Sequence, residues 1–239
     1  MDVEDAKRAV RERVWKALDL ADAVEPPGAA GHIPSFVGAD LASRRLEALE
    51  VWQRARVVKA NPDKAQLPVR EAALRQQKLL YMAAPRIATP EPFYLLDPAK
   101  VSVDAASSKR AAEVAPTVGP PTMQPVDIVV CGTVAVDRRG VRIGKGAGFS
   151  DIEMGLLAEV GLLGPHTTIV TTVHQLQVVD DELPETEHDF RVDLIVTPDE
   201  VIRCEPSPRP RGIIWEHLSL EKIKSIPALA ARQGQRSSS

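Results

Sequence analysis

The sequence of 239 residues is poor in aromatic side chains, in cysteine and in long hydrophobic runs. Because only 4% of the residues are aromatic, the core must consist mostly of Val, Leu, Ile and Ala, the mixture of buried parallel sheets covered by helices. No apolar run approaches the roughly 18–20 residues that a membrane-spanning helix requires. The first ten residues also lack the basic and then apolar order of a secretory signal. We therefore expect an α/β protein of the cytoplasm.

The two cysteines, Cys131 and Cys204, form no CxxC pair. Free cysteine usually packs as a small hydrophobic residue, so we expect inert thiols rather than a disulfide or a metal site. Acidic residues number 33 against 30 Lys and Arg, which gives a net charge of −3. A dedicated nucleic-acid-binding protein carries a clear positive excess, so nucleic acid is not an expected partner.

Hydrophobic residues in the first part of the chain recur at helical spacing and predict a helix over 3–20. A second helix is expected over 41–54. Segments 55–60 and 78–84 have the composition of short buried strands, and residues 61–77 between them read as a turn and a helix. The order strand, helix, strand is typical of a right-handed parallel crossover, which favours an α/β fold.

The remaining boundaries follow from composition. Residues 101–125 are rich in Ala, Ser and Pro and predict a surface excursion, a loop with at most one helical turn. Strand-like runs occupy 167–179 and 191–204. We expect one domain over 1–229 and a flexible tail over 230–239, because the final residues have little to bury.

The most informative stretch is 126–163, where a β-prone strand leads into a glycine-rich loop and then a helix. Ser150 followed three residues later by Glu153 has the pattern of a capping box, so the helix is expected to begin near Asp151. The free backbone N–H groups of its first turn would face the loop. Such groups attract anions, which makes this stretch a candidate phosphate site.

The loop combines glycines that let the backbone approach a ligand with a cluster of cations. These residues are Gly140, Gly144, Gly146, Gly148, Arg138, Arg139, Arg142 and Lys145. No acid occurs from 138 to 150, and in a chain of negative net charge this local positive excess favours a polyphosphate ligand. The alternative is a solvated basic hairpin. The spacing matches neither a P-loop nor GxGxxG.

The string VDIVVCGTVAVDRRGVRIGKGAGFSD closely resembles the signature of the 5-formyltetrahydrofolate cyclo-ligase family, also called methenyltetrahydrofolate synthetase. In that signature a hydrophobic strand leads into G-x-R-[LI]-G-[RK]-G-G-G-Y-Y-D. The family's opening helix carries a Lys and an Arg four residues apart, matched here by Lys7 and Arg11, and its late acidic segment is matched by 183–193. The ending over 209–229 resembles a cyclo-ligase-like branch that includes the methenyltetrahydrofolate synthetase-domain proteins.

The resemblance implies a three-layer α/β fold with a mainly parallel sheet, of the type shared with ribose-phosphate isomerases and CoA transferases. It also implies a reaction, in which ATP phosphorylates the formyl oxygen of 5-formyltetrahydrofolate, N10 attacks the activated carbon and phosphate leaves to give 5,10-methenyltetrahydrofolate. Such phosphoryl transfer depends mainly on positioning and charge neutralisation. The implied ligands are ATP, Mg²⁺ and a reduced folate as small-molecule substrate.

Site residues follow from the resemblance by position. The phosphates of ATP would be held by Lys7, Arg11, Arg142 and Lys145, the last two also acting in catalysis, with loop contacts from Gly144, Gly146, Ala147, Gly148 and Phe149. Asp151 and Asp189 would hold Mg²⁺, which prefers hard oxygen ligands. Each has a plainer interpretation: Lys7 and Arg11 as the solvated face of an amphipathic helix, and Asp151 as a favourable charge at a helix N-terminus. His188 is assigned no catalytic role.

Two departures from the family pattern concern the folate side. The family's two tyrosines are here Phe149 and Ser150, and its middle glycine is Ala147. The Glu-containing motif that contacts folate in the family is not found in 33–46. Alternatives to the cyclo-ligase reaction are therefore an ATP-dependent paralogue acting on another pteridine- or pyrimidine-like substrate, and a non-catalytic nucleotide- or RNA-binding regulatory module.

Overall fold

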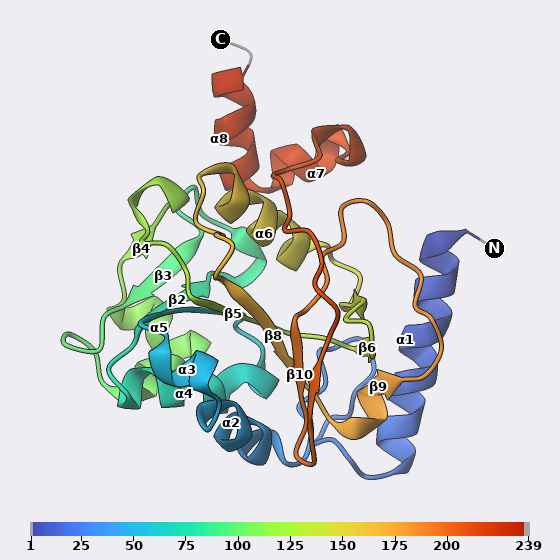
Figure 1. Ribbon diagram of the computed structural model, residues 1–239. Coiled ribbons are helices and arrows are strands. Elements are labelled where there is room, and N and C mark those ends of the chain that lie inside the picture. The colour runs from blue at the N-terminus through green and yellow to red at the C-terminus, as the bar shows by residue number, and fades with distance from the viewer. Residues whose placement is uncertain (1, 237–239) are drawn as a thin grey trace.

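The computed structural model describes residues 2–236, which fold into a twisted central sheet with helices on both faces (Figure 1). The strands of this sheet are β1 (Val57–Ala60), β2 (Leu79–Ala83), β3 (Phe93–Leu96), β4 (Thr117–Val118), β5 (Ile128–Cys131), β8 (Thr168–Thr172), β10 (Leu194–Val196) and β11 (Val201–Arg203). Within the described residues their order is β11-β10-β8-β5-β1-β2-β3-β4. The five strands from β10 to β2 pair in parallel, and the strands at both edges pair antiparallel.

The helices are α1 (Val3–Leu20), α2 (Ala39–Glu47), α3 (Glu50–Arg54), α4 (Leu67–Arg75), α5 (Ser108–Val114), α6 (Phe149–Glu159), α7 (Leu220–Ser225) and α8 (Pro227–Arg236). Helices α2 to α5 cover one face of the sheet through small and aliphatic side chains and the fully buried Trp52. Helix α6 covers the other face, where Met154 and Leu157 pack on Val129 and Ile169. The predicted three-layer α/β arrangement is confirmed, and with it the parallel crossover from β1 through α4 to β2.

A second, smaller sheet in the order β7-β6-β9 lies beside α1. Its strands are β6 (Ala135–Asp137), β7 (Arg142–Ile143) and β9 (Val178–Val179). Two segments expected as single strand-like runs, 126–136 and 167–179, each divide between the two sheets. The first divides at Gly132, where a Cβ would lie 2.7 Å from an Asp63 carboxylate oxygen, so the chain passes close to the segment after β1.

The structure differs from the sequence prediction in three local features. The helix expected over 41–54 is two helices, because Leu49 adopts an extended backbone and packs against the core. Residues 101–125 are not a simple loop: they contain α5 and β4, and Ala105 and Ala111 are buried under the sheet. The segment expected as a tail from 230 is helical to Arg236, and Arg232 pairs with Glu159. Residues 237–239 of that prediction lie outside the described residues.

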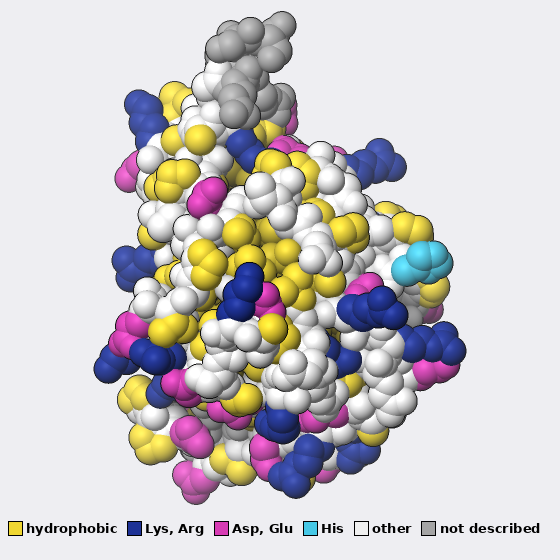
Figure 2. Space-filling model, turned by 90° about the vertical axis from the view of Figure 1, so that its left-hand side faces the viewer, with side chains coloured by type: hydrophobic (Ala, Val, Ile, Leu, Met, Phe, Trp, Pro, Cys, Tyr) yellow, Lys and Arg dark blue, Asp and Glu magenta, His cyan; other side chains and the backbone are white. Residues whose placement is uncertain are grey.

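Charge is spread over the surface without a dominant sign. Figure 2 shows Lys and Arg side chains interspersed with Asp and Glu, around a hollow lined by hydrophobic side chains below the C-terminal helix. In the part of the chain that the structure describes, no helix combines the length and apolar character that a membrane span requires.

Candidate functional site

A cavity of about 870 Å³ lies where β1, β2 and β5 end and α6 begins. Ligands of open α/β sheets bind beyond the carboxyl ends of the parallel strands, which is this position. Its walls come from distant parts of the chain: α1, the loop over 144–148, the segment around Asp189 and the C-terminal residues 212–222. The volume lies in the upper part of the range for small-molecule sites, about 300–1,000 Å³.

The loop from Gly144 to Gly148 forms one wall and is held by two arginines. Arg11 on α1 donates from Nε to the carbonyl oxygen of Gly144 at 2.8 Å, and Arg142 lies directly beneath that glycine. Gly146 has φ +95°, and a Cβ at this position would lie 3.3 Å from Cζ of Arg11. The backbone therefore runs between guanidinium groups with no room for a branched side chain.

Helix α6 points its N-terminus into the cavity, but without the predicted capping box. It begins at Phe149, two residues earlier than expected, because Gly148 serves as N-cap with φ 69° in the left-handed region. No side chain caps the first turn. Ser150 instead accepts a hydrogen bond from Asn61, and Glu153 pairs with Lys59. The positive end of the helix dipole thus faces the cavity, although not for the predicted reason.

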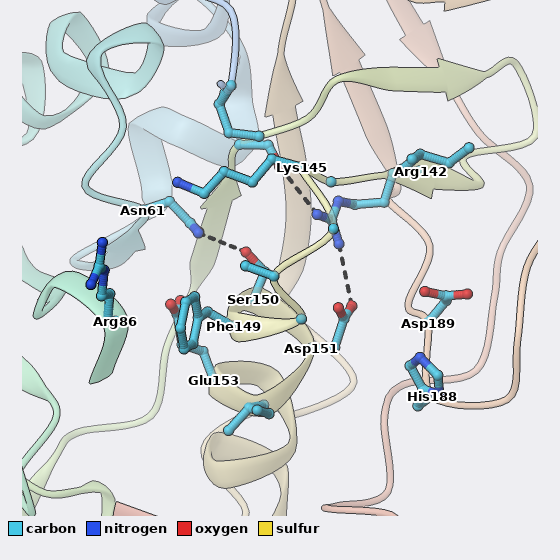
Figure 3. A pocket seen from close by; sticks show the side chains of 18 of the residues that line it. Asn61, Arg86, Arg142, Lys145, Phe149, Ser150, Asp151, Glu153, His188 and Asp189 are labelled. Carbon is cyan, nitrogen blue, oxygen red and sulfur yellow. Dashed lines mark hydrogen bonds and ion pairs between the residues drawn. The ribbon is translucent and has the colours of Figure 1, made fainter. Parts of the chain in front are cut away.

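Two carboxylates, Asp151 in the first turn of α6 and Asp189, lie on the side of the helix N-terminus away from Phe149 (Figure 3). Asp189 accepts from Nζ of the buried Lys7 at 2.5 Å and from the backbone N–H and hydroxyl of Thr186. Burial raises the pKa of Asp189, but these donors outweigh burial and the pKa lies below its ordinary value. Burial also raises the pKa of Asp151, and Arg142 at 3.4 Å offsets this only in part, so that pKa lies above its ordinary value.

Arg142 is buried below the loop and has several partners. Its guanidinium stacks on Phe190 with 4.6 Å between Cζ and the ring centroid, and Nη2 donates to the carbonyl oxygen of Gly132. Its Nε is buried and has no hydrogen-bond partner among the described residues. Lys145 is the more accessible cation: its side chain is 42% exposed, and its Nζ lies 3.7 Å from Asp63.

Each site residue predicted from the sequence lines this one cavity: Lys7, Arg11, Arg142, Gly144, Lys145, Gly146, Ala147, Gly148, Phe149, Asp151 and Asp189. Arg138 and Arg139 do not line it. They lie in the turn between β6 and β7, where Arg138 pairs with Glu200 and Arg139 pairs with Glu182. Gly140 serves that turn, since a Cβ there would meet the carbonyl oxygen of Val192. Two of the four cations predicted for the phosphate site therefore belong to an ion-paired hairpin outside the cavity. For these two, the alternative of a basic hairpin describes the structure better than a phosphate site.

Several lining residues had no signal in the sequence pattern. Asn61 follows β1, Arg86 lies in the short 3-10 helix η2 (Pro85–Ile87), and His217 and Lys222 come from the C-terminal segment. Lys222 donates to the carbonyl oxygen of Ala147 at 2.7 Å and lies 4.5 Å from the ring centroid of Phe149. The segment searched for the folate motif, 33–46, contributes only Ile33 among the described lining residues.

Comparisons with known proteins show which family the chain belongs to. The model of the 5-formyltetrahydrofolate cyclo-ligase family matches residues 3–198. The chain belongs to this family. It is 36% identical over 242 residues to a human methenyltetrahydrofolate synthase domain-containing protein, and 37% identical over 234 residues to the Danio rerio protein of that name. These alignments cover 96% and 94% of this chain but only 63% and 61% of the relatives' lengths.

The fold of the family is also found among solved structures. The NMR structure of 5,10-methenyltetrahydrofolate synthetase from Aquifex aeolicus superimposes with a TM-score of 0.55 at 21% sequence identity, covering 91% of this chain and all of that one. The family and branch predicted from the glycine loop and the C-terminal ending are thereby confirmed. The family model ends at residue 198, so Lys222 and His217 belong to a wall of the cavity that lies beyond it.

Proposed function

We propose that this chain converts 5-formyltetrahydrofolate to 5,10-methenyltetrahydrofolate in an ATP- and Mg²⁺-dependent reaction. One observation carries the proposal: a cation-lined glycine loop, an uncapped helix N-terminus and two carboxylates converge on a single cavity. The names of the family and of the relatives point to the same chemistry. Because residues from α1 and α7 line the same cavity, we also propose that 1–229 works as one domain.

The loop side of the cavity fits the triphosphate of ATP. Gly146 presents bare backbone to the cavity beside the guanidinium of Arg11, the first N–H groups of α6 have no side-chain cap, and the buried Nε of Arg142 lacks a partner among the described residues. When bound, ATP supplies the phosphoryl group that activates the formyl oxygen. Lys145, the most exposed of the four cations predicted to hold the phosphates, would contact them directly. Arg142, held by Gly132 and Asp151, would add fixed positive charge beneath the loop.

The carboxylates fit Mg²⁺ only together with phosphate oxygens. The described residues contain no group of three or more His, Cys, Asp or Glu side chains that could hold a metal ion alone. Asp151 and Asp189 offer two hard oxygen donors near the uncapped helix end, and each is also paired with a cation. Mg²⁺ commonly uses one or two carboxylates and completes its shell with water and substrate phosphates. We therefore expect Mg²⁺ to bind with the nucleotide rather than before it.

The folate would occupy the side of the helix N-terminus that faces Phe149, Asn61 and Arg86 (Figure 3). Phe149 offers a ring for stacking on a pterin. Arg86 makes no hydrogen bond or ion pair to another described residue, so its charge is available to the carboxylates of the folate's glutamate tail. Phe149 and Ser150, which replace the family's two tyrosines, lie on this side of the cavity.

The deciding experiment mixes purified protein with 5-formyltetrahydrofolate, ATP and Mg²⁺ and follows the near-ultraviolet absorbance of the methenyl product. We expect a rise that requires both ATP and Mg²⁺ and is lost in Lys145→Ala, with Lys100→Ala, an exposed lysine outside the cavity, as control. A protein that binds neither ATP nor the folate would contradict the proposal.

A second candidate is an ATP-dependent reaction on another pteridine- or pyrimidine-like substrate. This candidate is favoured by Phe149 and Ser150, which stand in place of the family's tyrosines. It is also favoured by Lys222, which lies over the ring of Phe149 and takes up space on the folate side of the cavity. ATP binding without any absorbance change would support this candidate over the first.

A further inference from the structure

Ser150 and Glu153, the pair with the spacing of a capping box, connect α6 to the end of β1 instead of capping the helix. Glu153 forms an ion pair with Lys59 of β1, and both side chains are almost completely buried, with 4% and 1% of their side-chain surface exposed. Lys59 also donates to Oδ1 of Asn61 at 3.0 Å, and Nδ2 of Asn61 donates to Oγ of Ser150 at 2.8 Å. Four polar side chains thus form one hydrogen-bonded series, and its end at Asn61 and Ser150 lies at the cavity (Figure 3).

The buried ammonium group of Lys59 fixes the direction of every hydrogen bond in this series. An ammonium group has donors only, so the atom of Asn61 that faces Lys59 must be the carbonyl oxygen. The amide nitrogen of Asn61 then faces Ser150 and donates to its Oγ. The hydroxyl oxygen of Ser150 is therefore used as an acceptor, and its own hydrogen has no acceptor among the side chains and backbone that the structure describes.

We propose that Ser150 is an oriented hydrogen-bond donor to an oxygen acceptor of the bound ligand, and that Asn61, Lys59 and Glu153 are positioning residues. The acceptor is a carbonyl oxygen of the folate, on its formyl group or its ring, or a phosphate oxygen of the nucleotide; this assignment rests on the proposed function. The structure thus assigns a recognition role to the serine that stands in place of a family tyrosine. Burying an ion pair is costly, and here the pair fixes the orientation of a group at the cavity surface.

The test compares Ser150→Ala with Asn61→Asp by calorimetric titration of 5-formyltetrahydrofolate, 5-methyltetrahydrofolate and a non-hydrolysable ATP analogue. In Asn61→Asp the new carboxylate accepts from both Lys59 and Ser150, so the serine hydroxyl is turned away from the ligand although it is still present. We expect both variants to bind the ligand about 2- to 10-fold more weakly, the effect of one hydrogen bond. The double variant should be no weaker than either single one, and Ser150→Thr should recover most of the affinity.

The three ligands distinguish the acceptors. Weaker binding of the formyl but not of the methyl compound identifies the formyl oxygen, an equal loss for both identifies a ring carbonyl, and a loss confined to the ATP analogue identifies a phosphate. Ser102→Ala is the matched control, because it removes a hydroxyl that donates to the carboxylate of Asp104, and neither residue lines the cavity. Circular dichroism and thermal melting confirm that the variants fold.

Failure of this proposal is distinct from failure of the proposed function. If wild-type protein binds the ligands and Ser150→Ala binds all of them equally well, the donor role of Ser150 is overturned and the proposed function stands. Unchanged binding in Asn61→Asp would overturn the fixed direction of the hydrogen bonds. If wild-type protein binds none of the three ligands, the proposed function falls and the donor assignment falls with it.

Discussion

The cavity has two sides that differ in how the chain builds them. The loop side is made of a short contiguous stretch, Gly144 to Gly148, with Arg11 and Lys7 brought to it by one helix. The opposite side is assembled from Asn61, Arg86 and the C-terminal segment around Lys222, which are far apart in sequence.

The comparison teaches that the two sides depend on different physics. The loop side depends on backbone conformation, which a compact motif can encode in consecutive residues, and on Lys7 and Arg11, which a single helix supplies. The opposite side depends on side chains that meet only after folding, such as Asn61 and Ser150, which a hydrogen bond joins across 89 positions of the sequence. Changes on the loop side should therefore affect nucleotide binding, and changes on the opposite side should affect the second substrate more.

The largest effect is expected for Gly146→Val. Its φ of +95° disfavours any branched residue, at a cost of about 1–3 kcal/mol, and its side chain would meet Arg11. We predict loss of detectable ATP binding by calorimetry. Gly161→Val is the matched control, because Gly161 also has a positive φ, with no atom within 4 Å of the added Cβ. If Gly146→Val still bound ATP, the loop would not be the wall of the cavity that holds the nucleotide.

A smaller but specific effect is expected for Asp151→Asn. The change retains the shape of the side chain and removes the negative charge that Mg²⁺ would contact, while Arg142 keeps its bonds to Gly132 and its stacking on Phe190. We predict that the Mg²⁺ concentration needed for half-maximal nucleotide binding rises about tenfold. An Mg²⁺ titration identical to that of wild type would leave Asp151 only its role at the helix N-terminus.

On the opposite side, Lys222→Ala removes a hydrogen bond to Ala147 and a cation–π contact with Phe149. Together these contacts contribute about 1–2 kcal/mol. We predict an affinity for 5-formyltetrahydrofolate altered by about 3- to 10-fold and an ATP affinity that changes less, both by calorimetric titration. Lys224→Ala, an exposed lysine on the same helix, should leave both unchanged. Equal changes for the two ligands would remove the distinction between the sides.

The smallest effect is expected at the cysteines, which lie outside the cavity lining. Burial raises the pKa of Cys131, and burial together with nearby carboxylates raises the pKa of Cys204 to about 12. Alkylation requires the thiolate, so at pH 8 only roughly one Cys204 in ten thousand is reactive, and the rate should rise about tenfold per pH unit. Mass spectrometry after iodoacetamide treatment should show little labelling until the protein is unfolded. Rapid labelling at pH 7 would contradict the predicted inert thiols.

The sequence predicted the layers of the fold because they depend on local hydrophobic patterns. The parallel crossover around α4 and the helix over 3–20 are as predicted. The strand-like runs over 126–136 and 167–179 were predicted without their division between two sheets, because β-branched residues, which favour strands, occupy both parts of each run. The break between α2 and α3 was missed because Leu49 leaves the helix to pack against the core, a tertiary effect.

The amino-acid sequence alone determined the family, the α/β architecture and the glycine loop of the cavity, because glycines and strand patterns act through neighbours in the chain. Only the tertiary structure decided the partners of Ser150 and Glu153, which a local pattern assigned to the helix cap and the fold gives to Asn61 and Lys59. The physical reason is burial. Lys59 and Glu153 are enclosed when β1 and α6 pack together, and a buried charge must take the opposite charge that packing brings beside it.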